Sequence, residues 1–330
     1  MNRSHPASLV IKISFVALLA VGLWLISLIP SIRKSYAEEH AASATASPIP
    51  PSVTPTLTAS PTPTATFTPT PTATPTLTPW PPMPTAGLLN NDWQRLPILP
   101  EVSPTMKEVY LRGLTLGNDP RAFSKVGDCN SEAEFFLSPF DQPGKYKLGP
   151  YPDLQALIDN FGGSFSRVSV AAHTGFGPSA MFDPIWVDPS ICLTNEGPLE
   201  CEYRLHHPSI VLIGLGTHYS PISKFESQMR AVIEFSLARG VVPILATKVD
   251  EEGGDRVNAL IAYLAKQYDV PLWNFWLAEQ RLDNRGQPDG IHFTWASNDF
   301  GSKYNMLHGW PIRNLTALQA LDTVWRAVAE

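Results

Sequence analysis

Charged residues are scarce in this chain of 330 residues, of which they make up only 16%. The formal net charge is −6, and no basic stretch interleaved with aromatic residues is present. Nucleic-acid binding needs a basic surface, so the composition argues against a nucleic-acid partner. The sequence also lacks a glycine-rich phosphate loop and a dinucleotide-binding fingerprint. We therefore expect no nucleotide, and nothing in the sequence indicates another cofactor.

Asp, Glu, Lys and Arg are absent between Glu39 and Asp92, where proline and threonine recur instead. Residues 68–72, Thr-Pro-Thr-Pro-Thr, are typical of this tract. Proline removes backbone donors, and such a segment contains too few apolar residues to bury a core. We expect residues 36–90 to form a disordered, extended stalk. Tracts of this composition suit an O-glycosylated stalk, and a plain disordered linker is the alternative.

A long apolar run precedes the stalk. Residues 9–32 contain one charged residue, Lys12. Residues 13–30 would form a helix of about 27 Å, close to the thickness of one bilayer core. This length favours an uncleaved transmembrane anchor within residues 1–35, whereas a small-x-small pattern ending at Ala37 fits a cleaved signal peptide. The flanking charges do not determine the orientation.

Globular sequence runs from Asn91 to Glu330, which is long enough for one α/β domain. Apolar runs without alternation, such as residues 209–216, indicate strands that are covered on both faces. We expect strands at residues 122–128, 165–172, 209–216, 241–248 and 270–276, and helices at residues 153–161, 223–239, 255–268 and 315–329. This alternation predicts βαβ units and a mostly parallel sheet.

Chemically active residues follow several of the predicted strands. The segments are Gly127-Asp128-Cys129, Ala172-His173-Thr174-Gly175 and Gly216-Thr217-His218-Tyr219, and Asp289-Gly290-Ile291-His292 precedes the last predicted helix. In parallel sheets, ligand sites gather at the carboxyl ends of the strands. We therefore expect these four segments to lie near one another.

In this order the four segments resemble those of the SGNH/GDSL-type hydrolases, over most of residues 122–330. The family is a three-layer α/β/α sandwich with a mostly parallel central sheet. Asp289 and His292 stand at the family's Asp-x-x-His positions. Two positions differ, because Cys129 replaces the nucleophilic serine and His218 replaces the oxyanion-binding asparagine.

The resemblance implies a hydrolase of acyl or acetyl esters. In it, Cys129 would attack the ester, His292 would accept the proton and Asp289 would orient the imidazole. The N–H of Gly175 and the ring of His218 would bind the oxyanion. The substrate would be a small molecule or a glycan or lipid ester, because the family includes enzymes for lipids, acetylated sugars and thioesters.

The stalk indicates export, and exported proteins usually pair their cysteines. The chain has three cysteines. Cys192 and Cys201 share one short loop, so we expect a disulfide between them, which leaves Cys129 unpaired. We expect the domain to be extracytoplasmic, held at the membrane by the N-terminal helix, or secreted if that segment is cleaved.

Two other interpretations are compatible with the sequence. The altered residues Cys129 and His218 also fit a catalytically inactive surface domain that binds a glycan or a lipid. In addition, His173, His218, His292 and Asp289 would be plausible zinc ligands if they converged. No close metal-binding spacing supports such a centre, and we expect no metal.

Overall fold

The computed structural model describes residues 91–216, 221–249 and 254–330. All of them belong to the predicted domain of residues 91–330. The predicted membrane anchor (1–35) and the predicted stalk (36–90) lie outside the described residues. Within the described ranges, no helix combines the length and the apolar character needed to cross a membrane.

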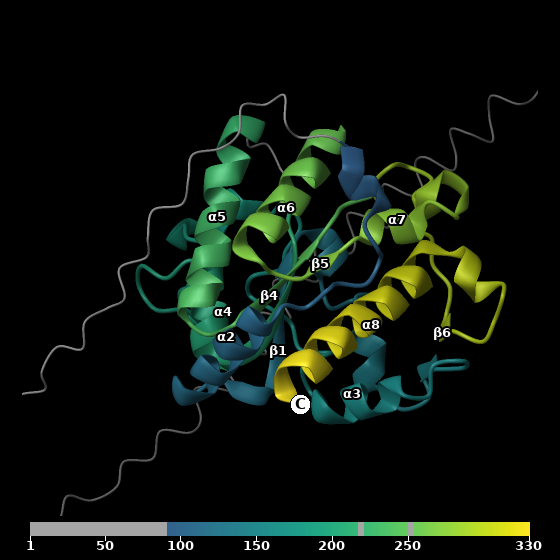
Figure 1. The fold of residues 1–330 in the computed structure, drawn as a ribbon, viewed down its shortest axis with the longest axis horizontal. Helices are drawn as coiled ribbons and strands as arrows, with labels where there is room; N and C mark the ends of the chain where they lie inside the picture. Colours follow the sequence, from purple (N-terminus) through teal and green to yellow (C-terminus); the bar gives the residue numbers. More distant parts are fainter. Residues whose placement is uncertain (1–90, 217–220, 250–253) are drawn as a thin grey trace, which may run out of the picture. The chain divides into compact units, whose positions relative to one another are not determined.

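A four-stranded parallel sheet forms the centre of this α/β domain (Figure 1). The strands are β1 (Asp119–Gly127), β3 (Pro208–Gly214), β4 (Val242–Ala246) and β5 (Leu272–Trp273), and they lie side by side in that order. Val126, Ile213, Leu245 and Leu272 follow one another across the sheet. All residues of β3 and β4 are buried, as predicted for strands that are covered on both faces. The prediction of a mostly parallel sheet is confirmed.

Helices pack against this sheet or against one another. They are α2 (Pro104–Thr115), α3 (Leu154–Asn160), α4 (Pro198–His206), α5 (Ile222–Ala238), α6 (Gly254–Tyr268), α7 (Phe275–Glu279) and α8 (Gly309–Ala329). By their contacts, α2 packs on β3, β4 and α8, with α3 beside α8, whereas α5 and α6 pack on each other and on β4 (Figure 1). Helix α4 contacts β1. Side chains from all these elements share one core.

Helix α5 forms where its apolar periodicity predicts it. Phe225, Met229 and Val232 recur at helical spacing and are buried. The chain leaves the helix through Gly240, which has a φ of 69°. A Cβ atom on Gly240 would lie 2.3 Å from the Cα atom of Gly113 in α2. Glycine at both positions therefore lets α2 pack directly on the turn between α5 and β4.

The strand predicted at residues 165–172 does not form, and this prediction is wrong. Only one bridge joins this segment to β1, between Ala172 and Gly127. The N–H of Val170 donates to the Glu202 carboxylate at 3.0 Å. The N–H of Ala171 donates to the Ser169 hydroxyl at 3.1 Å. Since side chains take the amides that a ladder would need, the segment runs beside β1 without becoming a strand.

Other boundaries also differ from the predictions. The strand expected at residues 270–276 is only β5, because buried Asn274 donates its side-chain amide to the carbonyls of Trp93 and Leu96 and turns the chain away from the sheet. Helix α8 begins at Gly309, earlier than expected. Helices α2, α4 and α7 were not predicted. Neither was a small parallel pair formed by β2 (Tyr146–Lys147) and β6 (Asn298–Asp299).

Candidate active site

The Gly-Asp-Cys segment begins where β1 ends. Gly127 is the last residue of β1, and Cys129 opens a short 3-10 turn (Cys129–Ser131). A Cβ atom on Gly127 would lie 2.2 Å from the Ser131 hydroxyl oxygen and 2.8 Å from the Gly214 carbonyl oxygen. Only glycine therefore lets the turn fold back against the neighbouring strand, and this close packing sets the place of Cys129.

Asp128 holds this turn with both of its carboxylate oxygens. Its Oδ1 accepts a hydrogen bond from the N–H of Asn130 at 2.9 Å, and its Oδ2 forms a buried ion pair with Lys248 Nζ. Lys248 follows β4, where Asn258 bonds its backbone N–H and its carbonyl, both at 2.7 Å. The end of β4 is thereby tied to the turn of Cys129. Lys248 was not among the predicted site residues, because the strand predicted at residues 241–248 includes it; a charged residue at the end of an apolar strand was the available signal.

Asp289 and His292 meet as the sequence predicted. Asp289 Oδ2 lies 2.7 Å from His292 Nδ1, and its Oδ1 accepts the N–H groups of His292 and Ile291 at 2.7 and 3.0 Å. These bonds, led by the one from the His292 backbone, hold the pKa of the Asp289 carboxyl well below its ordinary value. Gly290 supplies the turn, with a φ of 78°. Asp289 is therefore an anion that fixes the orientation of the His292 ring.

The Cys129 turn and the Asp289–His292 loop are bonded to each other. The Asn130 side-chain amide donates to the Ile291 carbonyl at 3.3 Å, and Gln287 donates to the same carbonyl at 2.9 Å. Cys129 and His292 line one cavity of about 430 Å³. The described part of the chain has no hydrogen bond between the Cys129 sulfur and the His292 ring, although both groups line this cavity.

The electrostatic surroundings keep the Cys129 thiol neutral. Burial raises the pKa of the Cys129 thiol, and the carboxylates of Asp128 and Glu132 raise it further, whereas Lys248 and the N–H of Asn130 lower it. The raising effects prevail. The thiol therefore needs a base to become a nucleophile, and His292 is the imidazole that shares its cavity.

Two backbone N–H groups near the cavity make no hydrogen bond among the described residues. They belong to Cys129 and to Gly175, which has a φ of 84°. Thr174, which precedes Gly175, lines the same cavity as Cys129. Free amides of this kind are the donors that an oxyanion requires. His218, the third predicted donor, lies outside the described residues.

Arg313 of α8 supports the Cys129 turn and was not among the predicted site residues. This buried side chain donates from Nε to the Asn130 carbonyl at 2.9 Å. Its guanidinium carbon lies 4.6 Å from the ring centre of Phe136 and 4.7 Å from that of Phe275. An arginine on the buried face of an amphipathic helix was the available signal.

The predicted disulfide between Cys192 and Cys201 is present, and Cys129 is the free cysteine. Glu196, inside the closed loop, accepts hydrogen bonds from Arg204 Nε at 2.6 Å and Nη2 at 2.8 Å. The disulfide and the Arg204–Glu196 ion pair together hold the loop of residues 192–201 in place.

The alternative of a zinc centre gains no support from the geometry. Among the described residues, one group brings three potential ligand atoms together, Cys192, Glu196 and Cys201, and its two sulfurs already form the disulfide. His173 is not gathered with Asp289 and His292. Its Nδ1 instead lies 3.0 Å from the Thr174 carbonyl oxygen.

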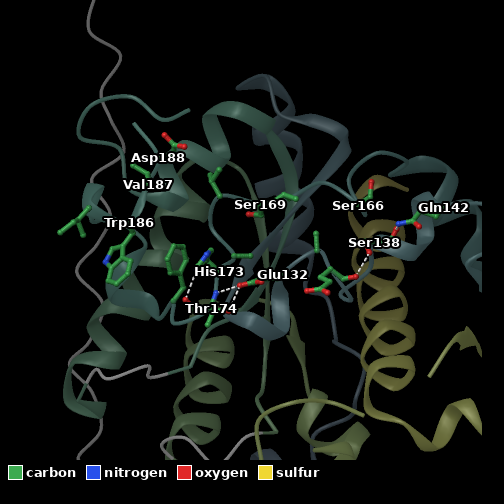
Figure 2. A pocket seen from close by; sticks show the side chains of 17 residues that line it. Glu132, Ser138, Gln142, Ser166, Ser169, His173, Thr174, Trp186, Val187 and Asp188 are labelled. Atoms are coloured by element: carbon green, nitrogen blue, oxygen red, sulfur yellow. Dashed lines mark hydrogen bonds between the residues drawn. The ribbon is translucent and has the colours of Figure 1, made fainter. Parts of the chain in front are cut away.

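A second, larger cavity of about 900 Å³ adjoins the first. Both are lined by Glu132, Glu134 and Thr174. Glu132 Oε1 accepts hydrogen bonds from the backbone N–H and the hydroxyl of Thr174, and Figure 2 shows this pair among the residues that line the larger cavity. The two cavities thus meet at the Glu132–Thr174 contact. Trp186 and Asp188 line the larger cavity on the side away from this contact.

The described residues therefore place a free thiol and the imidazole of an Asp–His pair in one cavity, and the unbonded amide of Gly175 follows Thr174 in its wall. No family model matches this sequence, and neither a curated protein nor a solved structure matches it.

Proposed function

We propose that residues 91–330 form a three-layer α/β/α hydrolase of SGNH type that cleaves acyl or acetyl esters. Its catalytic groups are Cys129, His292 and Asp289. The observation that carries the proposal is the Asp289–His292 contact of 2.7 Å in a loop whose imidazole lines the same cavity as the free thiol. The order of the Gly-Asp-Cys and Asp-x-x-His segments along the chain gives independent support.

The tautomer of His292 follows from its partner. With a proton on Nδ1 facing the Asp289 carboxylate, Nε2 carries a lone pair and acts as the base. Nε2 takes the Cys129 proton while the sulfur forms a bond to the ester carbonyl carbon. The tetrahedral intermediate then breaks its bond to the alcohol oxygen, which leaves with the proton from His292. Water, deprotonated by the same imidazole, hydrolyses the thioester and releases the acid.

The negative charge that develops on the carbonyl oxygen needs donors. The unbonded N–H groups of Cys129 and Gly175 are suited to this role, and His218 would supply a ring N–H if it replaces the family's asparagine. The loss of one such donor slows catalysis by about 10²–10³-fold, so the exchange at residue 218 affects the rate strongly.

The proposal includes a place in the cell. The domain acts outside the cytoplasm, anchored through residues 1–35 and carried on a stalk of residues 36–90. Its partners are the membrane, through this anchor, and a small-molecule, glycan or lipid ester. The disulfide Cys192–Cys201 supports an oxidising compartment.

A catalytically inactive domain that binds a glycan or lipid is the second candidate. Two observations favour it: the raised pKa of the Cys129 thiol and the absence of a hydrogen bond from that sulfur to His292 among the described residues. Both describe the ligand-free site, and catalytic hydrogen bonds often tighten only when substrate is bound. We therefore rank this candidate second.

Turnover of p-nitrophenyl acetate by the purified full chain in detergent distinguishes the two candidates. We expect hydrolysis that is abolished in Cys129→Ala and in His292→Ala, since each variant removes one partner of the proton transfer. Cys129→Ser should retain intermediate activity, because the hydroxyl keeps a nucleophile in nearly the same volume. His308→Ala is the matched control, because it removes an imidazole that does not line the cavity. Its rate of hydrolysis should equal that of the parent chain.

Full activity in Cys129→Ala would contradict the role of the thiol. Absence of hydrolysis in the parent chain, at a pH high enough to form the thiolate, would favour the binding domain.

A further inference from the structure

The larger cavity is more than an extension of the reaction site, because its walls have a distinct chemistry. At about 900 Å³ it lies in the range of ligand pockets, about 300–1,000 Å³. It meets the smaller cavity of Cys129 at the Glu132–Thr174 contact. A ligand bound across both cavities would place one part beside the thiol and another part in the larger space.

An exposed indole forms one wall. Trp186 is 53% exposed, and its ring packs edge-on against Phe176 with the ring centres 5.8 Å apart. The loop that carries it is held by Asp183, which accepts the Ile185 N–H at 3.0 Å. The disulfide Cys192–Cys201 closes the segment that follows. These bonds brace the loop, and the exposed indole that it carries suits stacking on a flat apolar face of a ligand.

Valine and isoleucine side chains also line the cavity, but the wall opposite Trp186 carries polar side chains (Figure 2). It includes Gln142 and Ser166, and neither the Ser166 hydroxyl nor the Gln142 side-chain oxygen is hydrogen-bonded within the described ranges. An aromatic wall facing hydroxyl and amide groups matches a ligand that has both C–H faces and hydroxyls. An acyl chain would instead leave these polar groups desolvated without partners, which is unfavourable.

The negative charge of the cavity walls restricts the charge of the ligand. Glu132, Glu134 and Asp188 line the larger cavity, and neither cavity is lined by a lysine or an arginine from the described part of the chain. Ser190 donates a side-chain and a backbone hydrogen bond to Asp188, and these bonds lower the pKa of that carboxyl. A uronate, sulfate or phosphate group would meet carboxylates without a compensating cation.

We propose that the larger cavity binds the carbohydrate part of an uncharged O-acylated oligosaccharide. One sugar of the oligosaccharide stacks on Trp186, and the acyl group of the oligosaccharide lies beside Cys129. This inference rests on the proposed ester hydrolysis and names its substrate class. The bond that breaks joins the acyl carbon to a sugar oxygen. The sugar hydroxyl leaves with the proton from His292, and the acid is released after hydrolysis of the thioester.

The test compares three esters on the full chain in detergent: partially O-acetylated xylo-oligosaccharides, O-acetylated oligogalacturonates and p-nitrophenyl acetate. We expect turnover of the neutral oligosaccharide to exceed that of the anionic one. Trp186→Ala should lower kcat/KM for the neutral oligosaccharide about tenfold while leaving p-nitrophenyl acetate unchanged, since stacking on one ring is removed. Ile191→Ala, an exposed residue of the same loop that does not line the cavity, is the matched control.

A binding measurement separates this inference from the proposed hydrolysis. Calorimetric titration of the Cys129→Ala chain with deacetylated xylo-oligosaccharide should give binding that Trp186→Ala weakens about tenfold and Ile191→Ala preserves, whether or not the parent chain is an esterase. Equal or tighter binding of oligogalacturonate, or no binding of the neutral oligosaccharide, would overturn the inference. So would a loss in Trp186→Ala that affects p-nitrophenyl octanoate but not the acetylated oligosaccharide, because the cavity would then hold acyl chains.

Discussion

Cys129 illustrates how much a single residue depends on its neighbours. A thiol is intrinsically a better nucleophile than a hydroxyl at neutral pH, yet burial and the Asp128 carboxylate raise the pKa of this one. Lys248, which forms an ion pair with Asp128, lowers the pKa of the Cys129 thiol. The reactivity of the thiol therefore depends on its burial and on the Asp128–Lys248 ion pair, of which Lys248 was not predicted.

Two opposite substitutions test this electrostatic control. Asp128→Asn removes the carboxylate and leaves the ammonium, so the pKa of the Cys129 thiol should fall and iodoacetamide alkylation near neutral pH should become about three- to tenfold faster. Lys248→Met removes the cation, so alkylation should slow. The measurement is the alkylation rate against pH, which in the parent chain should rise with an inflection above the ordinary thiol value of about 8.5.

General damage to the turn would shift both variants in the same direction. A common direction would therefore contradict the electrostatic account. The control is the alkylation rate of each variant after denaturation, which should equal that of the denatured parent chain.

At the scale of elements, a buried network explains why residues 165–172 follow β1 without joining the sheet. The Glu202 carboxylate of α4 is fully buried, and it accepts hydrogen bonds from the Ser124 hydroxyl at 2.7 Å, from Arg167 Nη1 at 3.1 Å and from the Val170 N–H at 3.0 Å. One carboxylate thus ties α4, β1 and the segment before His173 together. The position of Gly175 depends on this network, because the same segment leads to it.

Removal of the cation from this network should destabilise the domain strongly. Arg167→Leu removes the cation that hydrogen-bonds to the buried Glu202 carboxylate, so the free energy of unfolding should fall by about 3–5 kcal/mol. Urea denaturation followed by circular dichroism measures the change. Lys147→Met is the matched control, because its pair with Asp299 is solvent-exposed and should contribute less than about 1 kcal/mol. Similar losses in the two variants would contradict the role of burial.

At the scale of the whole molecule, the disulfide supports the proposed extracytoplasmic location and also stabilises the fold. Cys192 and Cys201 are nine positions apart and close a loop beside the larger cavity. In the chain-entropy account, closing such a loop stabilises the native state by about 2–3 kcal/mol. The paired variant Cys192→Ser with Cys201→Ser should lose this amount in urea denaturation.

Reduction of the parent chain should give the same loss as the double variant. A variant that is as stable as the oxidised parent would show that the Arg204–Glu196 pair alone holds the loop. In either case the free thiol of Cys129 should react with iodoacetamide before and after reduction.

The sequence by itself determined the parallel α/β architecture. Burial on both faces demands uninterrupted apolar strands, and amphipathic helices such as α5 show their period directly. It also determined two local features, the Asp289–His292 pair and the Cys192–Cys201 disulfide, since their partners are close in the chain. The anchor, the stalk and His218 lie outside the described residues and stay predictions.

Only the tertiary structure decided which distant groups meet. Lys248 pairs with Asp128 and Arg313 bonds to Asn130 because the ends of β4 and α8 are brought to the end of β1. Hydrophobic periodicity carries no information about such contacts, since they depend on the packing of whole elements. The same holds for residues 165–172, where the Glu202 carboxylate of α4 takes the amide that a strand would have used.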